Sequence, residues 1–122
     1  MLKRKPKKQT KYTILAKCYD KKDRLLSVGV NSYRKTHPLM QLFAKLAGQQ
    51  QRIFLHAEVL ALLRAKDNEV HTLTVERYDS KGQMQLAKPC KVCQQAIEYF
   101  GVKQVTYTDT NGWVSYLVDQ EE

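Results

Sequence analysis

Two short segments of this chain carry a histidine, a glutamate and two cysteines at spacings suited to holding a metal ion and moving protons. They are His56-Ala57-Glu58 and Pro89-Cys90-Lys91-Val92-Cys93. Imidazole nitrogens and thiolates are good zinc ligands, and a catalytic zinc site has three protein ligands and a fourth position for water. His56, Cys90 and Cys93 supply that number. Glu58 is a candidate general acid and base, because a carboxylate beside the metal can carry protons.

The cysteine pair is predicted to open a helix. Cys90 and Cys93 are three positions apart, so they lie on one face of a helical turn. Pro89 suits the first turn, where its missing N–H is not needed, and Gly101 is a natural stop for a helix that ends near residue 100. The unpaired N–H groups and the dipole at a helix start favour thiolates.

The histidine and the glutamate impose a condition on their own helix. His56 and Glu58 are two positions apart, and in the middle of a helix they would point to different sides. They converge on one site only where the helix begins. The segment 53–66 has apolar residues at helical spacing, so its helix is expected to start close to His56. Two helix starts would then face each other across one metal ion.

The rest of the chain predicts five strands around these helices. The expected strands are 12–19, 24–33, 71–78, 102–108 and 113–118, with a further helical stretch at 40–47. Asn-Gly at 111–112 is the strongest short-range hairpin signal. The last two strands are therefore expected to run antiparallel, because a parallel pair needs a long crossover. An α/β sandwich is the simplest architecture for this order.

The composition indicates one domain preceded by a basic segment. The 122 residues are 43% hydrophobic and 27% charged, with a net charge of +9, which is ordinary for a globular chain apart from the charge. Residues 1–11 carry six Lys or Arg and no acid, so we expect a basic flexible tail at 1–11 and a domain at 12–122. Such a tail attracts phosphate backbones through counterion release, or else only aids solubility.

Cysteine usage and hydropathy favour a cytoplasmic location without a membrane partner. No apolar run approaches the ~20 residues that span a bilayer, and no apolar stretch follows the basic N-terminus as in a secretory signal. Three cysteines, two of them in C-x-x-C, fit metal binding in a reducing compartment better than a disulfide framework.

Each motif alone has other interpretations. H-A-E tripeptides are common in helices, and C-x-x-C also occurs in thioredoxin-like redox pairs and in structural zinc knuckles. A structural zinc would need a fourth ligand, for which His71 and Cys18 are candidates, although neither has ligand-pair spacing. Cys18, in a strand, is also read as a buried small hydrophobe.

The order H-x-E and then P-C-x-x-C resembles the signature of zinc-dependent nucleobase deaminases. Over about residues 12–118 the chain is similar to the cytidine deaminase-like superfamily. V-G-V-N-S-Y-R-K-T-H-P, L-H-A-E and K-P-C-K-V-C resemble compact, often virus- or phage-borne, cytidine/deoxycytidylate deaminase-like proteins. The resemblance implies a three-layer sandwich: a five-stranded mixed sheet with helices on both faces, an antiparallel C-terminal hairpin, and Zn²⁺ held between two helices.

Four residues are candidates for substrate contacts. Asn31, after the second strand, matches the family's sugar-binding asparagine, and Ala57 lies inside the H-A-E motif. His37 is a candidate for a phosphate or base contact, and Phe54 for stacking on a base. Two features depart from the family pattern. His56 stands where classical free-cytidine enzymes have a cysteine, and the stretch 76–88 differs from the short T-x-E-P-C-type entry.

The expected function is therefore zinc-dependent hydrolytic deamination of a cytosine base in a free (deoxy)cytidine nucleoside or nucleotide. One alternative is an editing deaminase for single-stranded RNA or DNA, motivated by the basic tail. Another is a non-catalytic, zinc-stabilised module that binds nucleic acid. The family resemblance also implies a homo-oligomer.

Overall fold

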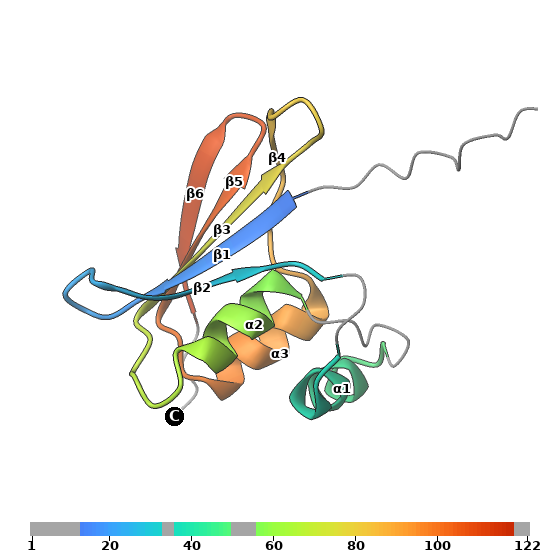
Figure 1. Ribbon diagram of the computed structural model, residues 1–122, viewed down its shortest axis with the longest axis vertical. Coiled ribbons are helices and arrows are strands. Elements are labelled where there is room, and N and C mark those ends of the chain that lie inside the picture. Colours follow the sequence, from blue (N-terminus) through green and yellow to red (C-terminus); the bar gives the residue numbers. More distant parts are fainter. Residues whose placement is uncertain (1–12, 33–35, 50–55, 119–122) are drawn as a thin grey trace, which may run out of the picture.

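A mixed β-sheet is the framework of the molecule (Figure 1). The computed structural model describes residues 13–32, 36–49 and 56–118. Its strands are β1 (Thr13–Tyr19), β2 (Leu25–Val30), β3 (Thr72–Tyr78), β4 (Met84–Gln85), β5 (Gln104–Asp109) and β6 (Gly112–Leu117). Its helices are α1 (Pro38–Leu46), α2 (Ala57–Arg64) and α3 (Lys91–Tyr99).

The sheet has the strand order β2-β1-β3-β5-β6, and the two-residue β4 pairs with β3. β1 is antiparallel to both β2 and β3, whereas β3 and β5 are parallel and are joined through α3. β5 and β6 form the antiparallel hairpin that the Asn-Gly turn predicted. The five predicted strands and the mixed sheet are thus confirmed, and β4 is an addition that the sequence pattern did not indicate.

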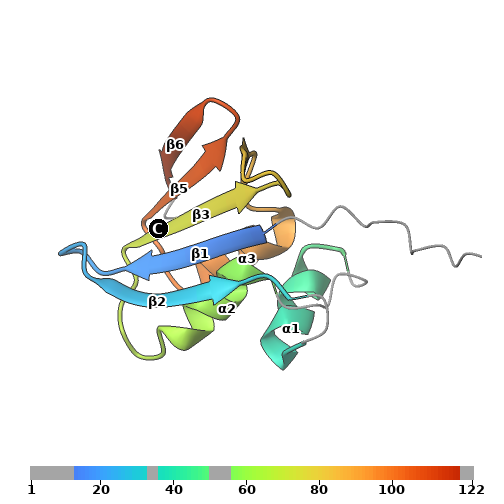
Figure 2. The same cartoon turned by 45° about the horizontal axis from the view of Figure 1, so that its top comes forward.

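All three helices lie on one side of this sheet (Figures 1 and 2). Alternate β1 residues face the helices: Ala16 and Cys18 belong to the core, and the partly buried Ile14 packs against it. The intervening positions face the other way, where Lys17 pairs with Glu76 at 3.7 Å across β1 and β3. Helices were expected on both faces; in the described ranges they cover one.

The backbone of α2 packs unusually close to the backbone of β2 at Gly29. A Cβ built on Gly29 would lie 2.4 Å from the carbonyl oxygen of Ala57 and 2.6 Å from the amide nitrogen of Ala61. Beside it, the Ser27 hydroxyl donates a hydrogen bond to the Ala61 carbonyl at 2.7 Å. Only glycine permits this approach. The close contact fixes the first turn of α2 relative to the sheet.

The helix boundaries refine the sequence predictions. α1 begins at Pro38, earlier than the predicted 40–47, because His37 caps it: His37 Nδ1 accepts a hydrogen bond from the Leu39 N–H at 3.0 Å. α3 lies inside the predicted 89–100, and Gly101, with φ of 71°, follows its end as expected. In the described part of the chain no helix is long and apolar enough to cross a membrane.

Candidate metal centre and active site

The metal ligands are brought together by the starts of two helices. His56 is the N-cap of α2 and Cys90 is the N-cap of α3, and both have extended backbones. Cys93 lies in the first turn of α3 and is fully buried. The predicted start of α2 is confirmed, because the helix begins directly after His56. Helix α3 begins two residues later than predicted, at Lys91, so Pro89 precedes the N-cap and does not lie in the first turn.

Three ligand atoms from these residues lie within 4.8 Å of one another. His56 Nδ1 is 3.2 Å from Cys93 Sγ and 3.6 Å from Cys90 Sγ. Tetrahedral zinc with ordinary bond lengths separates a nitrogen ligand from a sulfur ligand by about 3.5 Å. The donor set and its spacing fit Zn²⁺, with His56 binding through Nδ1.

The pKa values of the two cysteine thiols are shifted in opposite directions. Hydrogen bonds from Cys93 and then from His56 lower the pKa of Cys90 to about 3, so this sulfur is a thiolate at neutral pH. Burial raises the pKa of Cys93 above its ordinary value, and the neighbouring Cys90 and Glu58 raise it further. Cys90 is thus ready to bind a cation, whereas Cys93 must release its proton when it does so.

Glu58 stands beside the ligands without being one of them. Its side chain is only 6% exposed, and burial raises the pKa of its carboxyl group. The Glu58 backbone N–H and the charge of His56 act in the opposite direction and lower this pKa, and Cys93 contributes last. Its carboxylate is not among the three clustered ligands. A buried carboxyl with a raised pKa next to a metal site is equipped to accept and return a proton.

Comparison with known families decides the class of this site. The family described as the cytidine and deoxycytidylate deaminase zinc-binding region matches residues 2–109. The chain belongs to this family. It is a zinc-dependent deaminase by that membership and by its His/Cys/Cys cluster. No curated protein and no solved structure matches the chain.

The candidates for a fourth structural ligand are not at the deaminase site. Cys18 is buried in β1, where burial raises its pKa to about 11. His71 Nδ1 is 2.8 Å from the Thr72 hydroxyl, and its ring lines a separate hollow. Among the described residues, only His56, Cys90 and Cys93 form a cluster of possible ligands. Three ligands are the number for a catalytic zinc.

The structure places three of the four predicted substrate contacts; Phe54 lies outside the described residues. Ala57 is buried in the first turn of α2. Asn31 follows β2, and its Oδ1 accepts a hydrogen bond from the Ile14 N–H at 3.1 Å. The His37 ring caps α1. Asn31 and His37 thus each have a structural contact, and their roles in substrate binding stay predictions.

Thr108, which the sequence analysis did not identify, anchors the segment 85–90 that leads to the first cysteine ligand. Thr108 is fully buried at the end of β5. Its hydroxyl donates to the Gln85 carbonyl at 2.8 Å and accepts from the Arg77 N–H at 3.2 Å. Its own carbonyl accepts from the Ala87 N–H at 2.8 Å. These bonds tie the segment leading to Pro89 and Cys90 to the sheet. A threonine in a strand gives no sequence signal of this role.

Proposed function

We propose that this protein converts cytosine to uracil in a free (deoxy)cytidine nucleoside or nucleotide. The observation that carries the proposal is the buried Glu58 carboxyl against a three-ligand metal cluster. Three ligands leave room for water, and the adjacent carboxyl supplies the proton transfers that hydrolytic deamination needs.

Glu58 performs two transfers in this scheme. His56, Cys90 and Cys93 would hold the zinc ion, and a bound zinc would make water more acidic and so supply a nucleophile at neutral pH. The Glu58 carboxylate takes a proton from the attacking water and delivers it to the ring nitrogen. The second proton goes by the same carboxyl to the exocyclic amine, which leaves as ammonia while the ring carbon keeps the oxygen. Water and cytosine become uracil and ammonia, and Glu58 is regenerated.

The size of the domain favours a small substrate. Residues 13–32, 36–49 and 56–118 form both the sheet and its helical layer, and within these ranges few elements remain to build a channel for a polynucleotide. Asn31 and His37, on the segment between β2 and α1, are the proposed contacts to the sugar and to a phosphate or the base.

A single-stranded nucleic acid is the second candidate substrate, and one observation favours it. Residues 1–11 carry six cations and lead into β1 at Thr13. The start of β1 lies at the active-site end of the sheet, because Ile14 bonds to Asn31 and the nearby Gly29 touches Ala57. A cationic segment entering at this end would attract a phosphate backbone toward the site.

The decisive experiment compares the wild type with Glu58→Gln on cytidine, deoxycytidylate, adenosine and short single strands, with ammonia release as the readout. The amide keeps the shape of the side chain but cannot shuttle protons, so the rate should fall about 10²–10⁴-fold while zinc content and melting temperature are kept. Glu98→Gln, an exposed change on α3, is the matched control and should leave the rate unaltered.

The choice of substrates distinguishes the three candidate functions. Turnover of cytidine or deoxycytidylate supports the proposal, and turnover of single strands alone replaces it with the editing function. Zinc-dependent binding of single strands without ammonia release from any substrate identifies a non-catalytic module. A Glu58→Gln rate above about a tenth of the wild-type rate contradicts the assignment of the general acid and base.

A further inference from the structure

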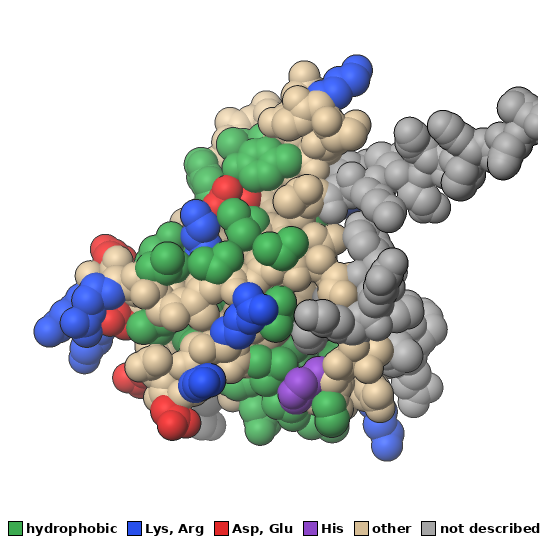
Figure 3. All heavy atoms as spheres, viewed as in Figure 1, with side chains coloured by type: hydrophobic (Ala, Val, Ile, Leu, Met, Phe, Trp, Pro, Cys, Tyr) green, Lys and Arg blue, Asp and Glu red, His purple; other side chains and the backbone are tan. Residues whose placement is uncertain are grey.

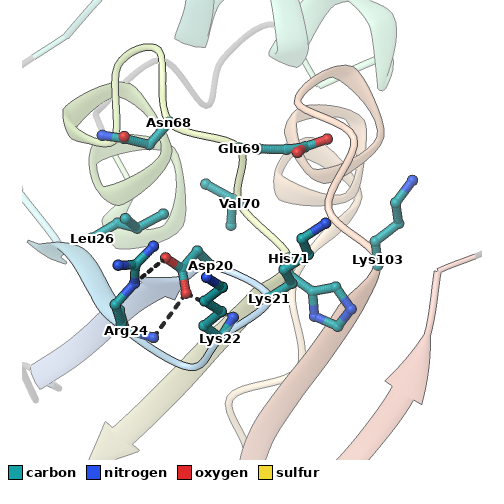
Figure 4. A pocket seen from close by; sticks show the side chains of 10 residues that line it. All are labelled: Asp20, Lys21, Lys22, Arg24, Leu26, Asn68, Glu69, Val70, His71 and Lys103. Carbon is teal, nitrogen blue, oxygen red and sulfur yellow. Dashed lines mark hydrogen bonds and ion pairs between the residues drawn. The ribbon is translucent and has the colours of Figure 1, made fainter.

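A hollow lies at the end of the sheet away from the metal ligands. It has a volume of about 380 Å³ and is formed by the β1–β2 turn, the loop between α2 and β3, and Lys103 before β5. Figure 4 shows Leu26 and Val70 among the lining side chains, with Lys21, Lys22 and Arg24 on the turn. A volume of this size with both apolar and charged walls is in the range of small-molecule sites.

The hollow has an excess of positive charge. The charge of Asp20 is balanced by an ion pair with Arg24. The Asp20 carboxylate accepts a hydrogen bond from Arg24 Nε at 2.8 Å and two more from the backbone N–H groups of Lys22 and Arg24. Three lysines then remain against one acid, Glu69. Within the described ranges, the side chains of Lys21, Lys22 and Lys103 form no ion pair. Figure 3 shows lysine and arginine side chains gathered at the β1–β2 turn.

This charge lies too far away to serve the deamination site directly. The β1–β2 turn joins the ends of β1 and β2 that are opposite to Ile14 and Asn31. β1 has seven residues, so the two ends of the strand are about 20 Å apart. Unpaired like charges around one hollow repel one another, and an anion seated between them removes that repulsion.

We propose that this hollow binds the phosphate group of a nucleotide. Lys21, Lys22 and Lys103 supply ammonium donors for the phosphate oxygens. Leu26 and Val70 supply apolar contact for the attached sugar or base. The nucleotide is either a free molecule or one unit of a strand. The site is independent of the zinc chemistry, since none of the three metal ligands lines it.

Amide chemical shifts of the zinc-loaded, ¹⁵N-labelled full chain test the proposal without turnover. The probes are inorganic phosphate, uridine 5′-monophosphate, uridine and an eight-residue oligothymidylate. Uridine monophosphate should shift the resonances of residues 20–24 and 68–71, whereas uridine should not shift them. The variant Lys22→Ala/Lys103→Ala should weaken that binding about five- to tenfold, as expected for two exposed ion contacts. Lys45→Ala/Lys81→Ala removes the same charge elsewhere and should change it less than about twofold.

The probes also identify the source of the phosphate. Equal affinity for uridine monophosphate and oligothymidylate indicates a free nucleotide, and tighter, more salt-dependent binding of the oligomer indicates a strand. Both results support the site. Shifts confined to residues 31–58 and 90–93 overturn it. Equal weakening by the two double variants also overturns it, because net charge alone would then explain the binding.

Discussion

Gly29→Ala is expected to disrupt the metal site indirectly, by displacing helix α2 from strand β2. The added Cβ would lie 2.4 Å from the Ala57 carbonyl oxygen, and ordinary contact begins near 3.4 Å, so helix and strand must separate by about 1 Å. Neither contact atom is a side-chain end that can swing away, because both belong to the α2 backbone. The φ of Gly29 is not in the left-handed region, so crowding is the only conflict.

The magnitude follows from that displacement. Overpacking of a tight contact costs about 1–3 kcal/mol in the free energy of unfolding, which lowers the melting temperature of a domain of this size by roughly 5–15 °C. His56 and Glu58 move with the start of α2 relative to Cys90 and Cys93 on α3. A misplacement of about 1 Å at a catalytic group reduces the rate up to about a hundredfold, and zinc should bind less tightly.

The assay measures melting temperature, zinc affinity by chelator competition, and turnover of deoxycytidylate in the same preparations. Gly82→Ala is the control: Gly82 has φ of +80° in the β3–β4 turn with nothing within 4 Å, so alanine there costs stability through backbone strain and leaves α2 in place. Gly29→Ala should lose zinc affinity and turnover, and Gly82→Ala only stability. If Gly29→Ala keeps wild-type zinc affinity and turnover, the close packing of α2 against Gly29 does not position the metal site.

Three further outcomes are expected. Cys93→Ala should reduce zinc from one ion per chain to near zero by metal analysis, and chelation of the wild type should lower its melting temperature, because the site contributes binding energy to stability; unchanged zinc would remove Cys93 from the ligand set. Asn31→Asp keeps the oxygen that accepts from Ile14 but replaces the amide donor, so it should raise KM for the nucleoside with little change in melting temperature; unchanged kinetics would assign Asn31 to structure alone. Deleting residues 2–11 should leave melting temperature and cytidine turnover nearly unchanged, and a large loss confined to single strands would favour the editing function instead.

The metal site was predictable because its determinants are local. The three-residue spacing of Cys90 and Cys93 and the two-residue spacing of His56 and Glu58 each restrict where a helix can begin, and the structure confirms the start of α2 and places that of α3 two residues after the predicted one. The final hairpin was equally local, since the Asn-Gly turn determines how β5 meets β6.

Features that depend on long-range contacts were not predictable. Thr108 ties down a segment more than 20 positions earlier in the chain, and Asn31 bonds to Ile14, 17 positions away. Neither residue type reveals its partner. The second face of the sheet was expected to be covered by analogy with the family, but helix coverage depends on elements that the described ranges of this chain do not contain. The basic hollow likewise combines three segments that are distant in sequence.

The arrangement of ligands on two helices has a kinetic consequence for folding. His56 and Cys93 are 37 positions apart, and β3 lies between them in the chain. Closing a loop of this length loses chain entropy, and the loop closes correctly only after β3 has entered the sheet and both helices have docked. We therefore expect metal capture to be a late event in refolding. A zinc-sensitive signal should lag behind the recovery of secondary structure during refolding. Such a lag would mean that zinc stabilises a nearly complete fold and does not nucleate folding.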